Sequence, residues 1–587
     1  MPNKKSSSLF KKVFSWLDDN IILVLSGFLL AFIPLYPKIP LYSPIEAYIV
    51  RIRLEDLFVL ITALIWLIQS IRGKIKWRAP IFWFVLAYAV AGALSVIDAV
   101  VVIKTIPFQM LHLGKSLLHY FRYLEYFSLL FITFSAVKSK KNLYLILVTM
   151  VLTLVAVVIY GYGQRFYYWP VYSTMNREFS KGVRLVLTEH ARVQSTFAGH
   201  YDLGGYLVII LPLILALALG VKKKVYKFLL YLAHWLGLWL LVVSASRTSF
   251  LAYLVGISLV ILLFGLKQSR IKAKLWWMFS REMLMVIMVA ITMFYYGDDM
   301  NERFLQVINT VPKVASTYHY LNDKRKILFD GNIEKFFFGD EGWPEWLAFK
   351  MPEATKPENS LTVEEATVLV SSDERPVPYR PSDVYEDIPD LVEVATISAE
   401  GKTETILVEK PRTFSANALE HGLSLAIRLD ALWPMAINGF KMNPLTGKGY
   451  ATLGKEGAYQ FTEADSTDNN YLRTLGETGI LGFVSFYGVI VTAIYFAFRG
   501  YGQKDELLVT LSIGFIASSF GLLVNASYID VYAASKVAFS YWGLTGFYLA
   551  SVTLLSPELL KVNWISKLDR QFDGYLIKMN KRIKSKK

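Results

Sequence analysis

The sequence predicts an all-α polytopic membrane protein with about twelve transmembrane helices. Of its 587 residues, 54% are hydrophobic and 15% are aromatic, and the mean hydropathy of the chain is positive. Many apolar runs reach roughly 18 to 20 residues, the length that a helix needs to cross the hydrocarbon core of a bilayer. Clusters of lysine and arginine recur in the connections between these runs.

In chain order, we expect the spans at 20–37, 55–71, 80–98, 118–136, 142–161, 203–220, 226–243, 248–266, 282–296, 480–498, 506–525 and 535–555. The first run lacks a small-residue cleavage site and is followed by further spans, so we expect it to stay as the first helix rather than act as a cleaved signal peptide. The predicted organisation is a cytoplasmic N-terminus 1–19, nine helices in 20–296, a large extracytoplasmic loop 297–479, three helices in 480–555, and a basic cytoplasmic tail 556–587.

The basic residues fall on alternate connections, and the net charge of the chain is +15. The clusters are Lys4, Lys5, Lys11 and Lys12; Arg72, Lys74, Lys76 and Arg78; Lys138, Lys140 and Lys141; Lys222, Lys223, Lys224 and Lys227; Lys267, Arg270, Lys272 and Lys274; Arg499 and Lys504; and Lys584, Lys586 and Lys587. By the positive-inside rule, this side is the cytoplasm and both termini are cytoplasmic. The charge therefore marks topology and does not call for a nucleic-acid partner. The absence of cysteine excludes disulfides and thiolate metal sites.

The expected outer face carries two long connections, 162–202 and 297–479, and a short turn at 244–247. Within the larger loop, residues 351–410 form an acidic insert whose stretch VEVATISAEGKTETILVEK predicts a β-hairpin turning at Glu400 and Gly401. This insert is either a cap or a surface decoration without chemistry. The following stretch NALEHGLSLAIRLDALWPMAINGFK has apolar residues at helical spacing and predicts an amphipathic helix along the outer membrane face, ended by Asn443 and Pro444.

The stretch ARVQSTFAGHYDLGGYLVIILPL places Arg192, His200 and Asp202 just before a span that opens with Gly204 and Gly205. An arginine at this depth is costly unless it pairs with an anion, and a lipid diphosphate is an anion that membranes supply. We therefore interpret these residues as candidates for substrate binding or catalysis. The alternatives are that Arg192 anchors to headgroups and that His200 caps the helix.

The stretch VVSASRTSF predicts a tight outer turn between two helices. Ser246 and Thr248 can cap the following helix, which is a complete structural account of these hydroxyls. Positive residues are scarce on the short outer turns, so we interpret Arg247 as a candidate substrate-binding residue, with Ser246 beside it.

Two further polar motifs lie late in the outer loop. In the stretch IRLDALWPMAINGFK, Arg428 leads a helix. NPLTGKGY then supplies a glycine-bearing loop able to bring backbone amides near a phosphate or sugar, or simply to stop the helix. TDNNYLRTLGETGILGF follows and places Asp468, Asn469 and Asn470 at a bilayer boundary, where we interpret Asn469 and Asn470 as candidate substrate-binding residues. The Asp468 carboxylate is a candidate base, or else a helix cap or a solvated acid.

Together and in this order, these motifs resemble those of the O-antigen ligase and O-antigen polymerase (Wzy-like) superfamily of bacterial membrane glycan transferases. The resemblance covers roughly residues 185–555 without the acidic insert. It implies a helical GT-C-like fold in the bacterial cytoplasmic membrane. It also implies transfer of a glycan from a polyprenyl diphosphate donor on the outer face to a glycan or lipid-glycan acceptor, with membrane lipids around the protein and without a cofactor or, in the ligases, a metal.

The resemblance also implies roles for individual residues. Arg192 and Arg247 match positions where the superfamily places diphosphate-binding arginines, and Arg428 is similar to a further arginine of its outer loop. The ligases carry a histidine just before an Asn-x-Tyr-Leu segment, and here Asp468 takes its place, which favours a polymerase or an atypical transferase. Either Asp468 or His200 is then the base, and the sequence does not choose between them.

A transporter of lipid-linked oligosaccharides or polysaccharides is the alternative interpretation of about twelve spans with basic connections. Such a protein should carry polar or broken helices near the bilayer midplane. The polar residues here lie mainly at the outer ends of the spans. His234 is the exception, and we expect it to be a hydrogen-bonded core histidine.

Overall fold

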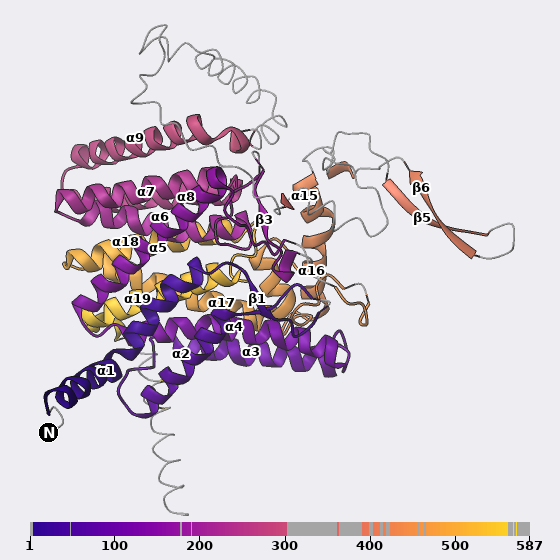
Figure 1. Cartoon of the computed structure of the whole chain (residues 1–587), viewed down its shortest axis with the longest axis horizontal. Helices are drawn as coiled ribbons and strands as arrows, with labels where there is room; N and C mark the ends of the chain where they lie inside the picture. The colour runs from indigo at the N-terminus through magenta and orange to yellow at the C-terminus, as the bar shows by residue number, and fades with distance from the viewer. Residues whose placement is uncertain are drawn as a thin grey trace, which may run out of the picture.

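The computed structural model describes residues 4–46, 48–175, 179–188, 191–301, 304, 361–362, 390–397, 403–410, 415–417, 423–455, 457–462, 465–561, 568 and 571. The long helices are α1 Lys4–Leu35, α2 Leu54–Ile71, α3 Phe82–Val101, α4 Met110–Ala136, α5 Lys140–Tyr167, α6 His200–Gly220, α7 Lys224–Val243, α8 Arg247–Leu266, α9 Ile271–Tyr296, α17 Asn470–Tyr501, α18 Glu506–Asn525 and α19 Ser535–Leu555. Figure 1 shows them running side by side, with β1, β3, α15 and α16 gathered toward one end.

Eleven of these helices are long and apolar enough to cross a membrane, so the described chain is a mostly helical multi-pass membrane protein, as predicted. The predicted span at 118–136 falls within α4, which is not among the eleven. This helix has the length to span, but it carries Lys115, Arg122 and Glu125 among its apolar residues. It packs along α19, so it belongs to the bundle.

Small strands and short helical turns complete the described structure. The strands are β1 Pro40–Tyr42 antiparallel to β2 Ile52–Arg53, β3 Leu185–Val186 parallel to β4 Leu361–Thr362, and β5 Asp390–Ile397 antiparallel to β6 Thr403–Lys410. The short turns are the 3-10 turns Phe179–Lys181 and Pro557–Leu560. The predicted hairpin is confirmed by β5 and β6, whose register pairs Ile397 with Thr403. The turn at Glu400 and Gly401, like most of the acidic insert, lies outside the described residues.

The connections gather at two opposite ends of the bundle, as the predicted alternation requires. We call the first the basic end; there Arg72 pairs with Asp18 at 2.6 Å, Lys140 with Asp505 at 3.7 Å, and Lys222 with Glu506 at 2.7 Å. We call the second the loop end; there the Val193 amide donates to the Val243 carbonyl, the Asn470 amide to Ala526, and Lys536 Nζ to the Tyr36 carbonyl. Which compartment each end faces stays a prediction.

The core of the bundle is formed around α6, α18 and α19, the helices with the largest buried share. The predicted role of His234 is confirmed in this core. Its side chain is fully buried, its Nε2 lies 2.9 Å from the Tyr253 hydroxyl, and its Nδ1 lies 3.2 Å from the Leu211 carbonyl oxygen.

The helix α17 begins at Asn470, ten residues before the predicted span at 480–498. It is interrupted at Gly479, whose φ of 62° and ψ of −165° are not helical. The polar stretch that precedes the apolar run is therefore a short helical segment and not a loop. It is helical because its polar groups bond to one another and to neighbouring connections.

The predicted amphipathic helix is also present, in three parts. It comprises α15 Leu423–Ile427, a π-helical turn Arg428–Leu432, and α16 Trp433–Met442, and it ends with Asn443 as its C-cap, as predicted. The π-helical turn was not predicted. Such turns widen a helix by one residue and recur at functional sites.

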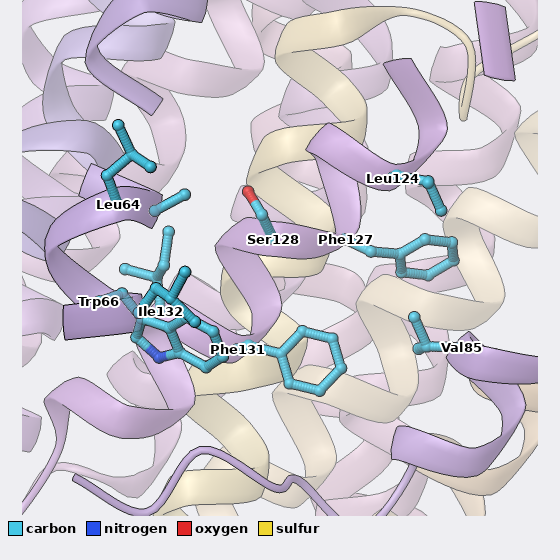
Figure 2. A pocket seen from close by; sticks show the side chains of 10 residues that line it. Leu64, Trp66, Val85, Leu124, Phe127, Ser128, Phe131 and Ile132 are labelled. Atoms are coloured by element: carbon cyan, nitrogen blue, oxygen red, sulfur yellow. The ribbon is translucent and has the colours of Figure 1, made fainter. Parts of the chain in front are cut away.

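An apolar opening of about 350 Å³ lies between α2, α3 and α4. Figure 2 shows its lining, which includes Trp66, Phe127 and Phe131. The one hydroxyl among the labelled residues, on Ser128, donates to the Glu125 carbonyl oxygen at 2.6 Å. This opening therefore offers no free polar group to a sugar or phosphate.

Candidate functional site

Three arginines from three separate motifs come together at the loop end. Arg192 lies in the connection before α6, Arg247 is the first residue of α8, and Arg428 opens the π-helical turn. The side chains that act electrostatically on Arg247 include Tyr201, Tyr528, Arg192 and Arg428. The Arg428 guanidinium carbon also lies 4.0 Å from the centre of the Tyr528 ring. We call Arg192, Arg247 and Arg428 the arginine cluster.

His200 orients one member of this cluster. Arg192 Nη1 hydrogen bonds to His200 Nε2, and because a guanidinium can only donate, Nε2 accepts and is unprotonated in this arrangement. The imidazole is buried, with its centre 3.9 Å from that of the Tyr201 ring. The predicted alternative that His200 caps the helix is wrong, since the N-cap of α6 is Gly199.

Asp468 supplies a carboxylate beside the cluster. Its Oδ2 lies 2.7 Å from Arg428 Nη2, and its Oδ1 accepts a hydrogen bond from Ser466 Oγ at 2.7 Å. The side chain is 32% exposed, so it stays within reach of a ligand. Burial raises the pKa of the Asp468 carboxyl, while the Arg428 guanidinium acts in the opposite direction.

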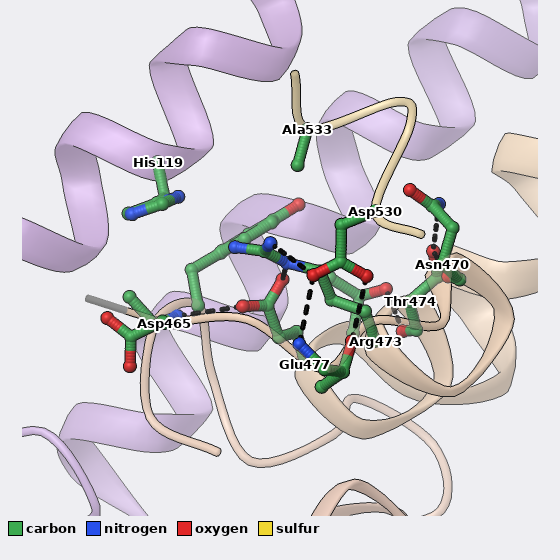
Figure 3. A network of polar contacts seen from close by, with 12 residues as sticks. His119, Asp465, Asn470, Arg473, Thr474, Glu477, Asp530 and Ala533 are labelled. Carbon is green, nitrogen blue, oxygen red and sulfur yellow. Dashed lines mark hydrogen bonds and ion pairs between the residues drawn. The ribbon is translucent and has the colours of Figure 1, made fainter. Parts of the chain in front are cut away.

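Asp530 holds the loop that carries Asp468. Its carboxylate accepts hydrogen bonds from Ser466 Oγ, Thr467 N, Thr467 Oγ1 and Asn469 N, at 2.9 to 3.1 Å. It also lies 2.9 Å from Arg473 Nη1, whose Nε is 3.4 Å from Glu477. Figure 3 shows Arg473, Glu477 and Asp530 directed toward one another. This buried network links the loop to the first segment of α17 and fixes the backbone of the loop.

Asn469 and Asn470 have structural roles. Asn469 caps α17, since its Oδ1 accepts from the amides of Tyr471 and Leu472 at 3.1 and 3.0 Å, and its Nδ2 donates to the Ser527 carbonyl at 3.0 Å. Asn470 is fully buried, and its Oδ1 accepts from the Tyr532 amide at 3.1 Å. The side chain of Asn470 is therefore directed into the protein, while Asn469 lies beside Asp468 as a cap.

The side chains of Ser246 and Asp202 interact with groups other than the arginine cluster. Ser246 is fully buried and donates to Ser249 Oγ at 2.8 Å, and Ser249 in turn bonds to Asn525, which ties α8 to α18. The hydroxyl of Ser246 is therefore bonded inside the protein. The strongest charges near Asp202 are those of Lys38 and Lys536, from a different group of buried ions.

The glycine-bearing loop 443–451 packs against the break in α17. Its Lys448 and Gly449 amides donate to the carbonyls of Gly476 and Glu477, at 2.8 and 3.0 Å. In return, the Ile480 amide donates to the Pro444 carbonyl at 2.8 Å. The amides of Lys448 and Gly449 are therefore already bonded inside the protein, which favours the alternative that this loop ends the helix.

Sequence reasoning missed Tyr201, Tyr528 and Asp530. The last two lie in NASYIDVY, the short loop-end turn between α18 and α19. Arg247 was a candidate because it is a polar residue on a short outer turn. The same criterion, applied to the turn between α18 and α19, identifies Tyr528 and Asp530. Tyr201 lies between the candidate residues His200 and Asp202, but no feature of the sequence distinguishes Tyr201 itself.

The chain matches no known protein-family model and no curated protein.

Proposed function

We propose that this protein is a membrane glycosyltransferase that transfers or polymerises a glycan carried on a polyprenyl diphosphate, in the assembly of a cell-surface polysaccharide. The observation that carries the proposal is the convergence of Arg192, Arg247 and Arg428 beside the Asp468 carboxylate at one end of a membrane bundle. The proposal includes a GT-C-like fold in the bacterial cytoplasmic membrane, with the loop end facing outward.

The arginine cluster suits a diphosphate leaving group. Breaking the bond between the sugar and the diphosphate leaves negative charge on the phosphate oxygens, and fixed cations lower the energy of that charge. A guanidinium presents a planar fork of donors that matches phosphate oxygens in pairs. In this proposal the arginines supply the charge neutralisation, and no metal or cofactor is required.

Asp468 is a better candidate for the base than His200. The acceptor hydroxyl attacks the anomeric carbon of the donor, the sugar–diphosphate bond breaks, and the hydroxyl proton passes to a carboxylate oxygen. The Nε2 lone pair of His200 is already occupied by Arg192, whereas Asp468 is partly exposed. His200 is then a positioning residue for Arg192.

One observation favours a transporter of lipid-linked glycans as the second candidate. The helix α17 is broken at Gly479, and transporters use broken helices to expose backbone groups to a ligand. Here, however, amides and carbonyls on both sides of the break bond to loop 443–451. We therefore rank the transferase first.

The experiment measures consumption of a polyprenyl-diphosphate glycan by purified protein in detergent, with no ion gradient. We expect Arg192→Lys and Arg247→Lys each to slow transfer about ten- to a hundredfold, because one charge-assisted contact contributes roughly 1.5 to 3 kcal/mol. Alanine at either position should slow transfer further, since lysine keeps the positive charge and loses only the forked donor geometry of the guanidinium. The double variant should lose less than the product of the two single effects, because both side chains act on one leaving group.

Arg184→Ala is the matched control, since Arg184 is an exposed arginine in the same connection as Arg192 and lies outside the arginine cluster. It should keep wild-type turnover. Wild-type turnover in both the Arg192→Ala and Arg247→Ala variants would reject the site. Glycan that crosses liposome membranes without being consumed would favour the transporter.

A further inference from the structure

A groove of about 750 Å³ opens at the basic end, far along the bundle from the arginine cluster. It is bounded by α5, α7, the last turn of α6 and the first turns of α18. The volume falls within the range of roughly 300 to 1,000 Å³ that is usual for ligand pockets. None of the residues proposed for transfer lines it.

The inner part of the groove is apolar. On α5 the lining extends from Tyr144 to Leu152, which is a little over two helical turns, or about 12 Å. Half of a hydrocarbon core is about 15 Å thick, so this length suits a chain that lies within one leaflet. Val148, Leu152 and Leu229 remain 54%, 63% and 51% exposed in the described structure, so no described helix covers them.

The mouth of the groove is charged. Lys222 and Lys223 lie in the connection between α6 and α7 and line the mouth together with Glu506 and Tyr226. Lys222 pairs with Glu506 at 2.7 Å, and these side chains are 79% and 71% exposed. Exposed pairs of this kind are weak, so Lys222 can exchange its carboxylate for another anion.

We propose that this groove binds one anionic phospholipid from the leaflet at the basic end. An acyl chain lies against the apolar lining, and the headgroup phosphate contacts Lys222 and Lys223. An apolar slot parallel to the helices with lysines at its mouth matches the two chemistries of this lipid, and basic pockets between transmembrane helices select anionic headgroups. The proposal does not depend on the proposed transferase activity.

The test is native mass spectrometry of the full chain, titrated with phosphatidylglycerol or with phosphatidylcholine of the same acyl chains. We expect one phosphatidylglycerol to be retained at concentrations at which phosphatidylcholine is not. Lys222→Ala with Lys223→Ala should weaken retention about fivefold per lysine. Leu229→Trp should also weaken it by filling the groove without a change of charge. Glu506→Gln should strengthen it, because Lys222 loses its competing carboxylate.

The matched control is Lys272→Ala with Lys274→Ala, which removes two lysines at the basic end that do not line the groove. It should leave retention unchanged. An equal loss in this control would overturn the proposal in favour of general attraction to the basic end. Equal retention of phosphatidylcholine, or full retention by the Leu229→Trp variant, would overturn it as well. The gain expected for Glu506→Gln keeps the test decisive even if a loss variant folds poorly.

Discussion

At the scale of single residues, the environment of Asp468 decides which chemistry the site can perform. Its φ of 49° lies in the left-handed region, which aspartate and asparagine tolerate better than most residues. Hydrogen bonds from the loop to Asp530 stabilise this conformation, and Arg428 and Ser466 each bind one oxygen of Asp468. The carboxylate is therefore placed before any acceptor arrives.

We predict that the rate of transfer falls on the acidic side of neutrality as Asp468 becomes protonated. A base acts only in its deprotonated form, and burial raises the pKa of this carboxyl, so the loss should begin at a higher pH than for an ordinary aspartate with a pKa of about 3.9. Asp468→Asn keeps the shape and the left-handed backbone but removes the base. It should lower the rate about 10²- to 10⁴-fold and abolish this acidic limb. The measurement is a pH–rate profile at subsaturating donor.

His200→Gln serves as the comparison for this profile. It should disturb the position of Arg192 and weaken donor binding, yet it should leave the acidic limb in place, because that limb belongs to Asp468. If His200→Gln removes the limb while Asp468→Asn retains it, the roles of the two residues are exchanged.

At the scale of elements, α17 shows which features of the fold can be predicted from the sequence and which cannot. Apolar runs located the spans well, because hydrophobicity over a membrane thickness is a property of the sequence alone. The helical segment before Gly479 was missed because its polar side chains are paired with Asp530 and with loop 443–451, and these partners are distant in the sequence. A polar segment next to a span cannot be assigned as loop or helix without such partners.

The positions of the site residues were likewise only partly predictable, because the partners of a side chain are not known from the sequence. Topology brings the ends of α6, α8 and α17 to one end of the bundle, so the convergence of the three arginines followed from the order of the spans. Topology does not say which way a side chain points. Ser246 and Asn470 were placed at the correct end, but both are directed into the protein, where their polar atoms bond to neighbouring helices and turns.

We predict that Gly479→Ala destabilises the protein. The φ and ψ of Gly479 lie in a region that is essentially restricted to glycine, and an added Cβ would meet the backbone of Leu445 and Thr446. The expected cost is roughly 1 to 3 kcal/mol for the backbone conformation, with the clash in addition. The measurement is the temperature at which half of the detergent-purified protein is lost from the monodisperse peak.

Gly27→Ala is the control for this substitution. Gly27 lies within α1, and a Cβ added there has nothing within 4 Å. Its loss temperature should match or exceed that of the wild type, since alanine favours a helix more than glycine does. A Gly479→Ala variant as stable as Gly27→Ala would mean that the break in α17 is not required by the packing of loop 443–451.

At the scale of the whole molecule, the two ends of the bundle have different chemistry. The basic connections and the proposed phospholipid groove lie at one end, and the arginine cluster with Asp468 lies at the other. The described contacts establish that the connections alternate between these ends. The functional proposal depends in addition on which end faces the cytoplasm.

We predict that the basic end is cytoplasmic, because lysines and arginines resist translocation and the basic clusters of the sequence follow this alternation. The chain has no cysteine, so Ser415→Cys and Ser269→Cys each introduce a single thiol, at an exposed position of the 297–469 connection and of the α8–α9 connection respectively. A membrane-impermeant maleimide applied to intact cells should label the thiol at 415 and should label the thiol at 269 only after the membrane is permeabilised. The thiol at 269 is the control for leakage, since any labelling of it before permeabilisation reports damaged cells. With intact cells, the opposite pattern would place the arginine cluster in the cytoplasm, where a donor displayed on the outer leaflet is out of reach, and the transferase proposal would fail.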